Sequence, residues 1–195
     1  MKKMKVFRCT MAILIALCLL FAGYVMGANS SAKTISRSEI FTNDSIVAVF
    51  DKNYGTLAFS GNGIVERCDE WITISQEDRC EIYDIVFHNG ISEIASNVVS
   101  NSFFRELPNL QRIYFEDDVS IGGGAFACNP RLRQVTFFSS CREIGFYAFG
   151  ECPELRNFDF ASCHEIDNMA FAFSPVDEIW RARCIYDVTP ITPTP

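Results

Sequence analysis

Residues 125–137 read AFACNPRLRQVTF, and residues 148–160 repeat nearly the same pattern as AFGECPELRNFDF. The pattern extends in both directions, because a phenylalanine recurs at intervals of 22, 23 and 22 residues with a proline four residues after each. The phenylalanines are Phe104, Phe126, Phe149 and Phe171, and the prolines are Pro108, Pro130, Pro153 and Pro175. A period in the twenties is typical of a solenoid, in which stacked units bury apolar faces that no unit buries alone.

Each repeat also contains an apolar triplet whose last two members have the two-residue spacing of a strand. In one repeat Val135 and Phe137 point inward, and Thr136 between them points outward. The triplets are Ile82, Ile85, Phe87; Leu110, Ile113, Phe115; Leu132, Val135, Phe137; Leu155, Phe158, Phe160; and the incomplete Val176, Ile179, Arg181. A further aliphatic position precedes the phenylalanine of each repeat, at Ile94, Ile121, Ile144 and Ile166. We therefore expect about five coils, with the first and last imperfect.

The segment between these apolar positions predicts a short helix. Residues 146–152, FYAFGEC, fit about one helical turn that buries Ala148 and Phe149. Pro153 ends this turn, because proline cannot donate the next helical hydrogen bond. The sequence thus predicts an α/β solenoid in which each coil has one short strand and one helical turn.

The repeat IGxxAFxxCxxLxxVxF resembles the BspA-like leucine-rich repeats of cell-surface and secreted proteins from host-associated bacteria and some parasitic protists. The match runs from Ile82 to Arg181, and in one coil it includes residues 144–145, 148–149, 152 and 155. The chain departs from the pattern where Cys128 comes one residue early, where Ser174 replaces a cysteine and where Asp167 replaces a glycine. The resemblance implies right-handed leucine-rich-repeat coils and a role in adhesion.

The residues before the repeats predict a cap. Residues 54–65, YGTLAFSGNGIV, with Trp71 after them, resemble the entry sequence of the same family. Asn62-Gly63 lies between two apolar runs and accepts the positive backbone angles of a tight turn, which favours a β-hairpin. We expect an N-terminal β-hairpin cap in residues 46–81 and the leucine-rich repeats in residues 82–187. At the far end only Trp180 is available to cover the last coil, so we expect an open C-terminal edge or a shortened member of a longer-repeat family.

The N-terminus predicts export. Basic residues up to Arg8 precede an uncharged run at residues 9–26, which is typical of a signal peptide that ends at Gly27. An uncleaved membrane anchor formed by residues 9–26 is the alternative. We interpret residues 28–45 as a linker and residues 188–195 as an unpacked Thr- and Pro-rich tail. The expected location is therefore secreted or at the cell surface.

Charge excludes one class of partner. The full chain has 17 Lys and Arg against 24 Asp and Glu. Four of the basic residues and none of the acidic residues lie in the predicted signal peptide. The mature chain therefore has 13 basic and 24 acidic residues, and a net charge near −11. No basic cluster follows Arg8, so we expect no nucleic-acid partner.

Seven cysteines remain after the leader. Cys68 and Cys80 are a candidate disulfide that would hold a short irregular loop beside the cap. Cys141, Cys163 and Cys184 lie 22 and 21 residues apart, at the same phase of successive coils. Three interpretations of this set stay open: buried apolar filler, one disulfide between coils, or a metal site with His164.

The sequence contains no catalytic constellation. Neither His88 nor His164 lies in a nucleophile motif, and adjacent Cys163 and His164 face opposite sides of an extended chain. The carboxylates of Asp117 and Asp118 fit a solvated turn, because the glycine-spaced ligands of a calcium loop are absent. We expect no enzyme activity, no cofactor and no metal.

The outward face of the strands is the candidate site. Tyrosine, tryptophan and arginine are enriched at binding hot spots, and repeat proteins bind along continuous sheet faces. The candidate residues are Arg112, Tyr114, Arg133, Thr136, Arg156, Asp159 and Trp180. The leading hypothesis is an exported, non-enzymatic module that binds a protein or glycan in cell-surface adhesion. The alternative is a structural module that self-associates through its open C-terminal edge.

Overall fold

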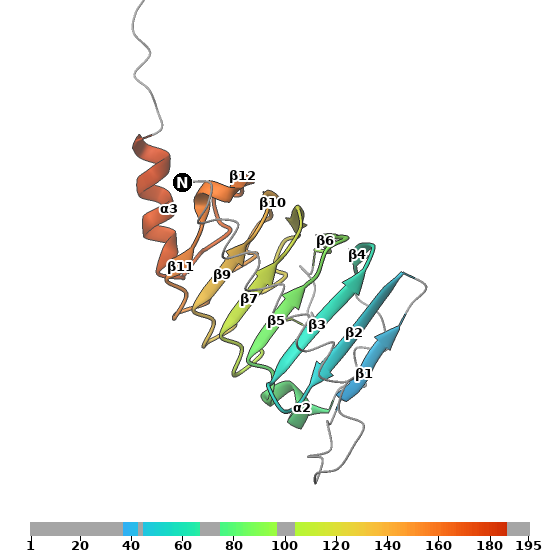
Figure 1. Ribbon diagram of the computed structural model, residues 1–195. Helices are drawn as coiled ribbons and strands as arrows, with labels where there is room; N and C mark the ends of the chain where they lie inside the picture. Colours follow the sequence, from blue (N-terminus) through green and yellow to red (C-terminus); the bar gives the residue numbers. More distant parts are fainter. Residues whose placement is uncertain (1–36, 43–44, 67–74, 97–103, 187–195) are drawn as a thin grey trace, which may run out of the picture. The chain divides into compact units, whose positions relative to one another are not determined.

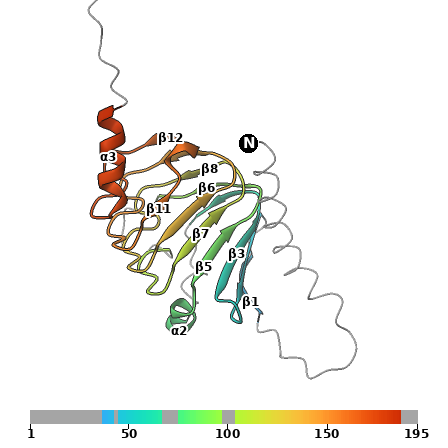
Figure 2. The same cartoon turned by 60° about the vertical axis from the view of Figure 1, so that its left-hand side comes forward.

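The computed structural model describes residues 37–42, 45–66, 75–96 and 104–186, which form two β-sheets with connecting turns (Figures 1 and 2). Sheet A contains, in spatial order, β1 (Arg37–Thr42), β2 (Ile46–Asp51), β3 (Thr56–Gly61), β5 (Asp84–Phe87), β7 (Arg112–Phe115), β9 (Gln134–Phe137) and β11 (Asn157–Phe158). Sheet B contains β12 (Cys163–Ile166), β10 (Cys141–Ile144), β8 (Val119–Ile121), β6 (Ile91–Ile94) and β4 (Gly63–Val65). The helices are α2 (Gln76–Cys80), the 3₁₀ helix η2 (Phe160–Ser162) and α3 (Val176–Tyr186).

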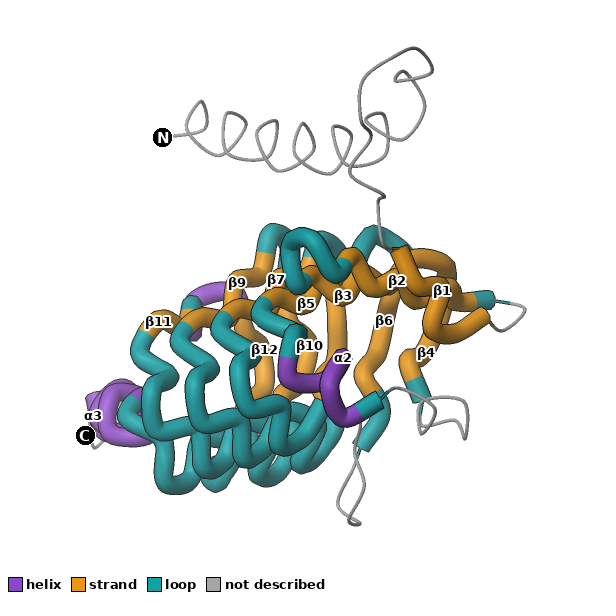
Figure 3. Tube along the Cα trace, turned by 90° about the horizontal axis from the view of Figure 1, so that it is seen from below, coloured by secondary structure: helices purple, strands orange, loops and turns teal. Residues whose placement is uncertain are grey.

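Successive coils each contribute one strand to sheet A and one to sheet B. The pairs β5–β6, β7–β8, β9–β10 and β11–β12 follow one another, and their turns stack in line (Figure 3). In sheet A the parallel register aligns Ile85, Ile113, Val135 and Phe158. The register of sheet B aligns the four predicted aliphatic positions, Ile94, Ile121, Ile144 and Ile166. The repeat therefore places equivalent residues side by side, as a solenoid requires.

Two phenylalanine ladders fill the space between the sheets. Phe59, Phe87, Phe115 and Phe137 stack along sheet A at centroid distances of 4.9, 4.9 and 5.2 Å. The repeat phenylalanines, 104, 126, 149 and 171, form a second ladder at 5.2, 5.5 and 5.9 Å. The ladders meet edge to face, for example where Phe87 and Phe126 lie 6.1 Å apart at 71°. Both geometries are favourable for aromatic rings, so each coil stabilises its neighbours.

The predicted hairpin turn at Asn62-Gly63 is wrong. Residues on its two sides belong to different sheets, because β3 pairs with β5 in sheet A and β4 pairs with β6 in sheet B. Gly61 and Gly63 have φ of 125° and 110°, and a Cβ at Gly61 would lie 2.0 Å from the Ser45 carbonyl oxygen. Glycine thus permits the change of sheet, and β3–β4 form an additional coil. The hairpin is instead β2–β3, through residues 52–55; that it caps the solenoid stays a prediction.

The predicted helical turn at residues 146–152 is also wrong. The segment forms turns without a helix, because its amides bond mainly to adjacent coils. Phe149 N–H donates to the Ala170 carbonyl at 2.8 Å, and Phe126 N–H donates to the Ala148 carbonyl at 2.8 Å. These bonds satisfy buried backbone groups that a helix would have satisfied locally.

Buried polar side chains join the same coils. Asn129 is fully buried; its Nδ2 donates to the carbonyls of Phe104 and Phe126 at 2.8 Å, and its Oδ1 accepts from Leu107 N–H at 2.8 Å. In the last coil Ser174 Oγ donates to the Phe149 carbonyl at 2.7 Å. Residues that depart from the cysteine of the family pattern thus hold neighbouring backbones together.

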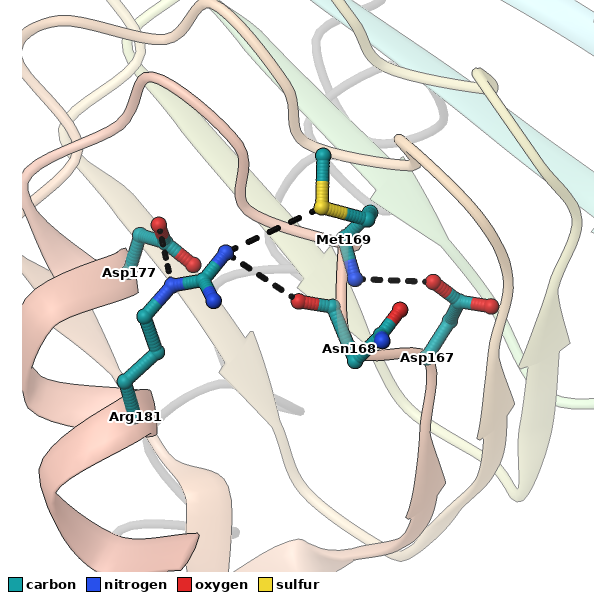
Figure 4. A network of polar contacts seen from close by, with 5 residues as sticks. All are labelled: Asp167, Asn168, Met169, Asp177 and Arg181. Atoms are coloured by element: carbon teal, nitrogen blue, oxygen red, sulfur yellow. Dashed lines mark hydrogen bonds and ion pairs between the residues drawn. The ribbon is translucent and has the colours of Figure 1, made fainter.

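The C-terminal end differs from its prediction. Residues 176–181, expected as a fifth strand before an open edge, begin helix α3, which stands at this end of the sheets (Figure 1). Val176 is fully buried, and the Trp180 ring stacks on Phe160 at 5.7 Å and 15°. Arg181 donates to Asp177 Oδ2 at 2.8 Å and to the Asn168 carbonyl at 3.5 Å (Figure 4). Val176 and Trp180 of α3 therefore cover the last coil. The spacing that predicted a strand at residues 176–181 also fits a helix.

Within the described residues, neither α2 nor α3 is both long and apolar enough to cross a membrane. The predicted signal peptide (residues 1–27), most of the linker and the tail at 188–195 lie outside the described residues.

Candidate functional site

The outward side of sheet A carries a continuous row of half-buried side chains. The register places Val49, Ala58, Val86, Tyr114 and Thr136 beside one another across β2, β3, β5, β7 and β9. We call this set the outer row. Because alternate residues of these strands are buried in the core, the outer row faces away from it.

Tyr114 is the only aromatic residue in the outer row. Its ring stacks on Phe138 at a centroid distance of 6.4 Å, and Phe138 is 41% exposed. Burial raises the pKa of Tyr114, so its phenol stays protonated near neutral pH and can donate a hydrogen bond. The two rings form an aromatic patch. The strand pattern did not predict that Phe138 belongs to it.

A cluster of charged side chains lies at the start of β9 and β11. Arg133, Glu154, Arg156 and Asn157 line an open depression. Arg133 Nε donates to Glu154 Oε2 at 2.7 Å, and both side chains are well exposed. Among the described residues the guanidinium of Arg156 has no ion-pair or hydrogen-bond partner, and it is exposed. We call these four residues the arginine depression; its Arg156 is free to bind an anionic group.

The remaining predicted residues of the face have local partners. Arg112 binds both carboxylate oxygens of Asp84, at 2.7 and 2.6 Å, and this bond raises the pKa of Arg112. Thr136 Oγ1 accepts a hydrogen bond from Gln134 at 2.9 Å. Arg112 and Thr136 lie on the face as predicted, but their polar groups are already engaged.

Two predicted face residues lie elsewhere. Asp159 follows the end of β11 and caps η2, since its carboxylate accepts from Ala161 N–H at 3.1 Å and from Ser162 Oγ at 2.8 Å. Trp180 lies in α3 and packs on the end of the core. Their assignment to the sheet face is therefore wrong, because the strand of the last coil ends at Phe158.

The acidic turn is a structural element. Asp118 Oδ1 accepts from the hydroxyls of Ser139 and Ser140 and, at 3.0 Å, from Ser140 N–H. These donors hold the pKa of Asp118 well below its usual range. The carboxylate thus links two coils, in agreement with the interpretation of this segment as a turn.

This linkage gives a prediction for acid titration. In an NMR titration from pH 6 to pH 2, we expect the Asp118 carboxyl to stay ionised below the pH at which an ordinary aspartate protonates. Because the folded pKa is depressed, its stabilisation is present above the unfolded pKa and is lost as the pH falls through the folded pKa. The matched variant Ser139→Ala/Ser140→Ala should raise the pKa of Asp118 toward its ordinary value, because it removes both hydroxyl donors and leaves the Ser140 N–H. An Asp118 that titrates normally in the wild type would contradict these contacts.

In the described part of the chain, His88 and the adjacent Cys163 and His164 have different surroundings. His88 Nδ1 lies 3.1 Å from Glu116 Oε2, whereas His164 is exposed and Cys163 packs against the core. No three His, Cys, Asp or Glu side chains among the described residues are placed to hold a metal ion.

The cysteines have different surroundings. Cys80 carries a free thiol, and its predicted partner Cys68 lies outside the described residues, so that disulfide stays a prediction. Cys141 and Cys163 are paired in the register of β10 and β12, as the repeat predicted. Cys184 falls in α3, so it does not continue the strand ladder, and its side chain lies outside the described set. Burial raises the pKa of Cys152 to about 12, which fits an inert core residue.

Comparisons with known proteins identify a leucine-rich repeat family. The model of the "BspA type Leucine rich repeat region" matches residues 73–177, with six copies. A solved leucine-rich repeat protein from Eubacterium ventriosum is 21% identical, with a TM-score of 0.49 over 68% of this chain. The match spans 40% of that protein's length. No curated protein gives a significant match.

Proposed function

The chain belongs to the BspA type leucine rich repeat family, and we propose that it is an exported module that binds a partner protein through the outward face of sheet A in cell-surface adhesion. Leucine-rich repeats generally serve as non-enzymatic modules for protein–protein interaction, and solenoids present extended binding surfaces. The arginine depression beside the outer row is the observation that carries the proposal.

Two features of the face support binding. Tyr114 and Phe138 supply an aromatic patch, and aromatic residues and arginine are the types that dominate binding energy at protein interfaces. Arg156 presents a guanidinium without a partner among the described residues, whereas Arg112 is neutralised by Asp84. A ligand therefore gains a charge-assisted contact at Arg156 without breaking an existing ion pair.

Charge indicates the kind of segment that binds. The whole chain has a net charge of −7, so its surface as a whole repels acidic partners. The arginine depression is a local exception, since it has two guanidinium groups and one carboxylate. We propose that an acidic segment of a partner protein enters this depression while apolar side chains contact Tyr114 and Phe138.

Export and adhesion rest on the sequence and the family. The basic start and the uncharged run at residues 9–26 support export, with a membrane anchor at the same residues as the alternative. BspA type repeats are typical of surface and extracellular proteins. Self-association through an open C-terminal edge is not favoured, because α3 covers the last coil.

Arg156→Glu is expected to weaken binding by at least about 10-fold, equivalent to about 1.4 kcal/mol, because it replaces the free cation with a charge that repels the acidic segment. The full-length chain is used as bait against a displayed library of acidic and neutral peptides and against a glycan array. Affinities for the selected ligands are then measured by biolayer interferometry.

Arg142→Glu is the matched control, because it makes the same charge change in sheet B, where Arg142 is exposed. It should retain affinity within about 2-fold, as expected for a site outside the interface. Ligands that bind Arg156→Glu as well as the wild type would contradict the proposed face. If only glycans are selected, the proposal that the partner is a protein is wrong.

A further inference from the structure

Two cysteines occupy paired positions on adjacent strands at the C-terminal end of sheet B. Cys141 in β10 and Cys163 in β12 are direct partners in the parallel register. Neighbouring strands place partner Cα atoms about 4.8 Å apart, which lies within the range of about 4.4–6.8 Å found for disulfides. Cys141 is fully buried and Cys163 is half-buried against the core. The backbone therefore already holds both residues at bridging distance.

The two thiols lie near one another. The Cys141 thiol donates to the Glu143 carbonyl at 3.4 Å and the Cys163 thiol donates to the Asp159 carbonyl at 3.6 Å. The neighbouring Cys141 thiol and burial raise the pKa of Cys163. Both cysteines are free in this structure. Each thiol therefore gives up one weak hydrogen bond to a carbonyl when the sulfurs join.

The position of β12 allows the last adjustment. Side chains in parallel register hold their Cβ atoms somewhat farther apart than a disulfide prefers, so one strand must move slightly. In the described part of sheet B, β12 is an edge strand that pairs only with β10, and its two middle residues are exposed. It can therefore shift toward β10 without breaking a second strand pair.

We propose that Cys141 and Cys163 form a disulfide that ties the last two coils together when the chain meets an oxidising environment. Cys128 and Cys152 make other contacts, and the partner predicted for Cys80 lies outside the described residues. Cys128 lies between Arg105 and Glu151, and Cys152 lies in the core with its thiol on the Phe126 carbonyl at 3.4 Å. The bond would close a loop between residues 141 and 163 and limit separation of the edge coil.

The chemistry is thiol–disulfide exchange with a disulfide oxidant such as oxidised glutathione. One cysteine thiolate attacks the oxidant to form a mixed disulfide and releases one glutathione thiolate. The second cysteine thiolate then attacks the protein sulfur of that mixed disulfide and releases the other. Two protein thiols are oxidised and one glutathione disulfide is reduced to two glutathiones. Because the pKa of Cys163 is raised, the reaction should accelerate as the pH rises above neutral.

Trypsin makes the pairing directly readable. Cys141, Cys163 and Cys184 fall in separate peptides, residues 134–142, 157–181 and 184–195. The full-length chain, purified under reducing conditions, is incubated with oxidised glutathione at pH 8.5. Remaining thiols are then alkylated and the digest is analysed by mass spectrometry. We expect a linked pair of peptides 134–142 and 157–181, and a melting temperature about 5 °C or more above that of the reduced chain.

Two variants make the result specific. Cys163→Ser should lose both the linked peptide and the rise in melting temperature, whereas Cys128→Ser should keep both. Alkylation of both Cys141 and Cys163 after oxidation, or a link from Cys163 to Cys184, would overturn the proposal. Occurrence of the bond in the cell rests on the proposed export. Formation of the bond in this assay does not depend on export. A failure of the proposed disulfide can therefore be distinguished from a failure of the proposed function.

Discussion

Phe149→Ala is expected to lower the free energy of unfolding by about 3–5 kcal/mol, as for other fully buried aromatic residues. The Phe149 ring is fully buried. It stacks on Phe126 at 5.5 Å and on Phe171 at 5.9 Å, and Phe158 meets it edge to face at 5.5 Å. The substitution therefore interrupts one ladder and opens a cavity where both meet. Urea denaturation followed by circular dichroism measures the change.

Phe146→Ala is the matched control, because the same side chain is removed three residues away. Phe146 is 51% exposed and contacts only the Tyr147 ring among the described aromatic residues. Its removal should change the free energy of unfolding by less than about 1 kcal/mol. Equal losses of unfolding free energy in the two variants would mean that the assignment of inward- and outward-facing residues in this coil is wrong.

Asn129→Leu is expected to lower the free energy of unfolding by about 2–4 kcal/mol, although the two side chains have similar size. Leucine leaves the Leu107 N–H and the Phe104 carbonyl without their bonds to Asn129, in a site that is fully buried. An unsatisfied buried polar group costs about 1–3 kcal/mol, and at least two groups are affected. Thermal and urea unfolding of the purified variant measure the loss.

Asn129→Cys tests the hydrogen-bond explanation. The equivalent position of the next coil is Cys152, whose thiol donates to the Phe126 carbonyl at 3.4 Å. A cysteine at position 129 can restore one weak donor in the same place, so its effect should fall between those of the wild type and Asn129→Leu. An Asn129→Leu variant as stable as the wild type would show that the three bonds do not stabilise the coil.

Much of the architecture was predictable because it depends on a periodic apolar pattern. Residues such as Ile113 and Val135 recur at one phase, and the register aligns them as predicted. The turns were not predictable from local pattern, because Phe149 N–H bonds to a carbonyl of the next coil. At Asn62-Gly63 the local turn signal was correct, but pairing of β3 with β5 and of β4 with β6 decided which sheets the turn connects.

The candidate site was predictable only in part. Alternation along strands placed Tyr114 on the outer row, and the repeat phase placed Arg133 and Arg156 on adjacent coils. The sequence did not show that Glu154 pairs with Arg133, because the two residues are 21 positions apart. It also did not show that residues 176–181 are helical, since spacings of three and five residues fit either structure for so short a segment.

Hydroxyl-radical footprinting of the full-length chain with a selected ligand tests the central claim, that the outward face of sheet A is the binding surface. Phe138, 41% exposed, lies on that face beside Tyr114, whereas Phe146 and Phe173, 51% and 76% exposed, lie on the turns that follow sheet B. We expect the ligand to reduce oxidation of Tyr114 and Phe138 and to leave Phe146 and Phe173 unchanged. Protection of Phe146 and Phe173 with Tyr114 and Phe138 unchanged would contradict the account.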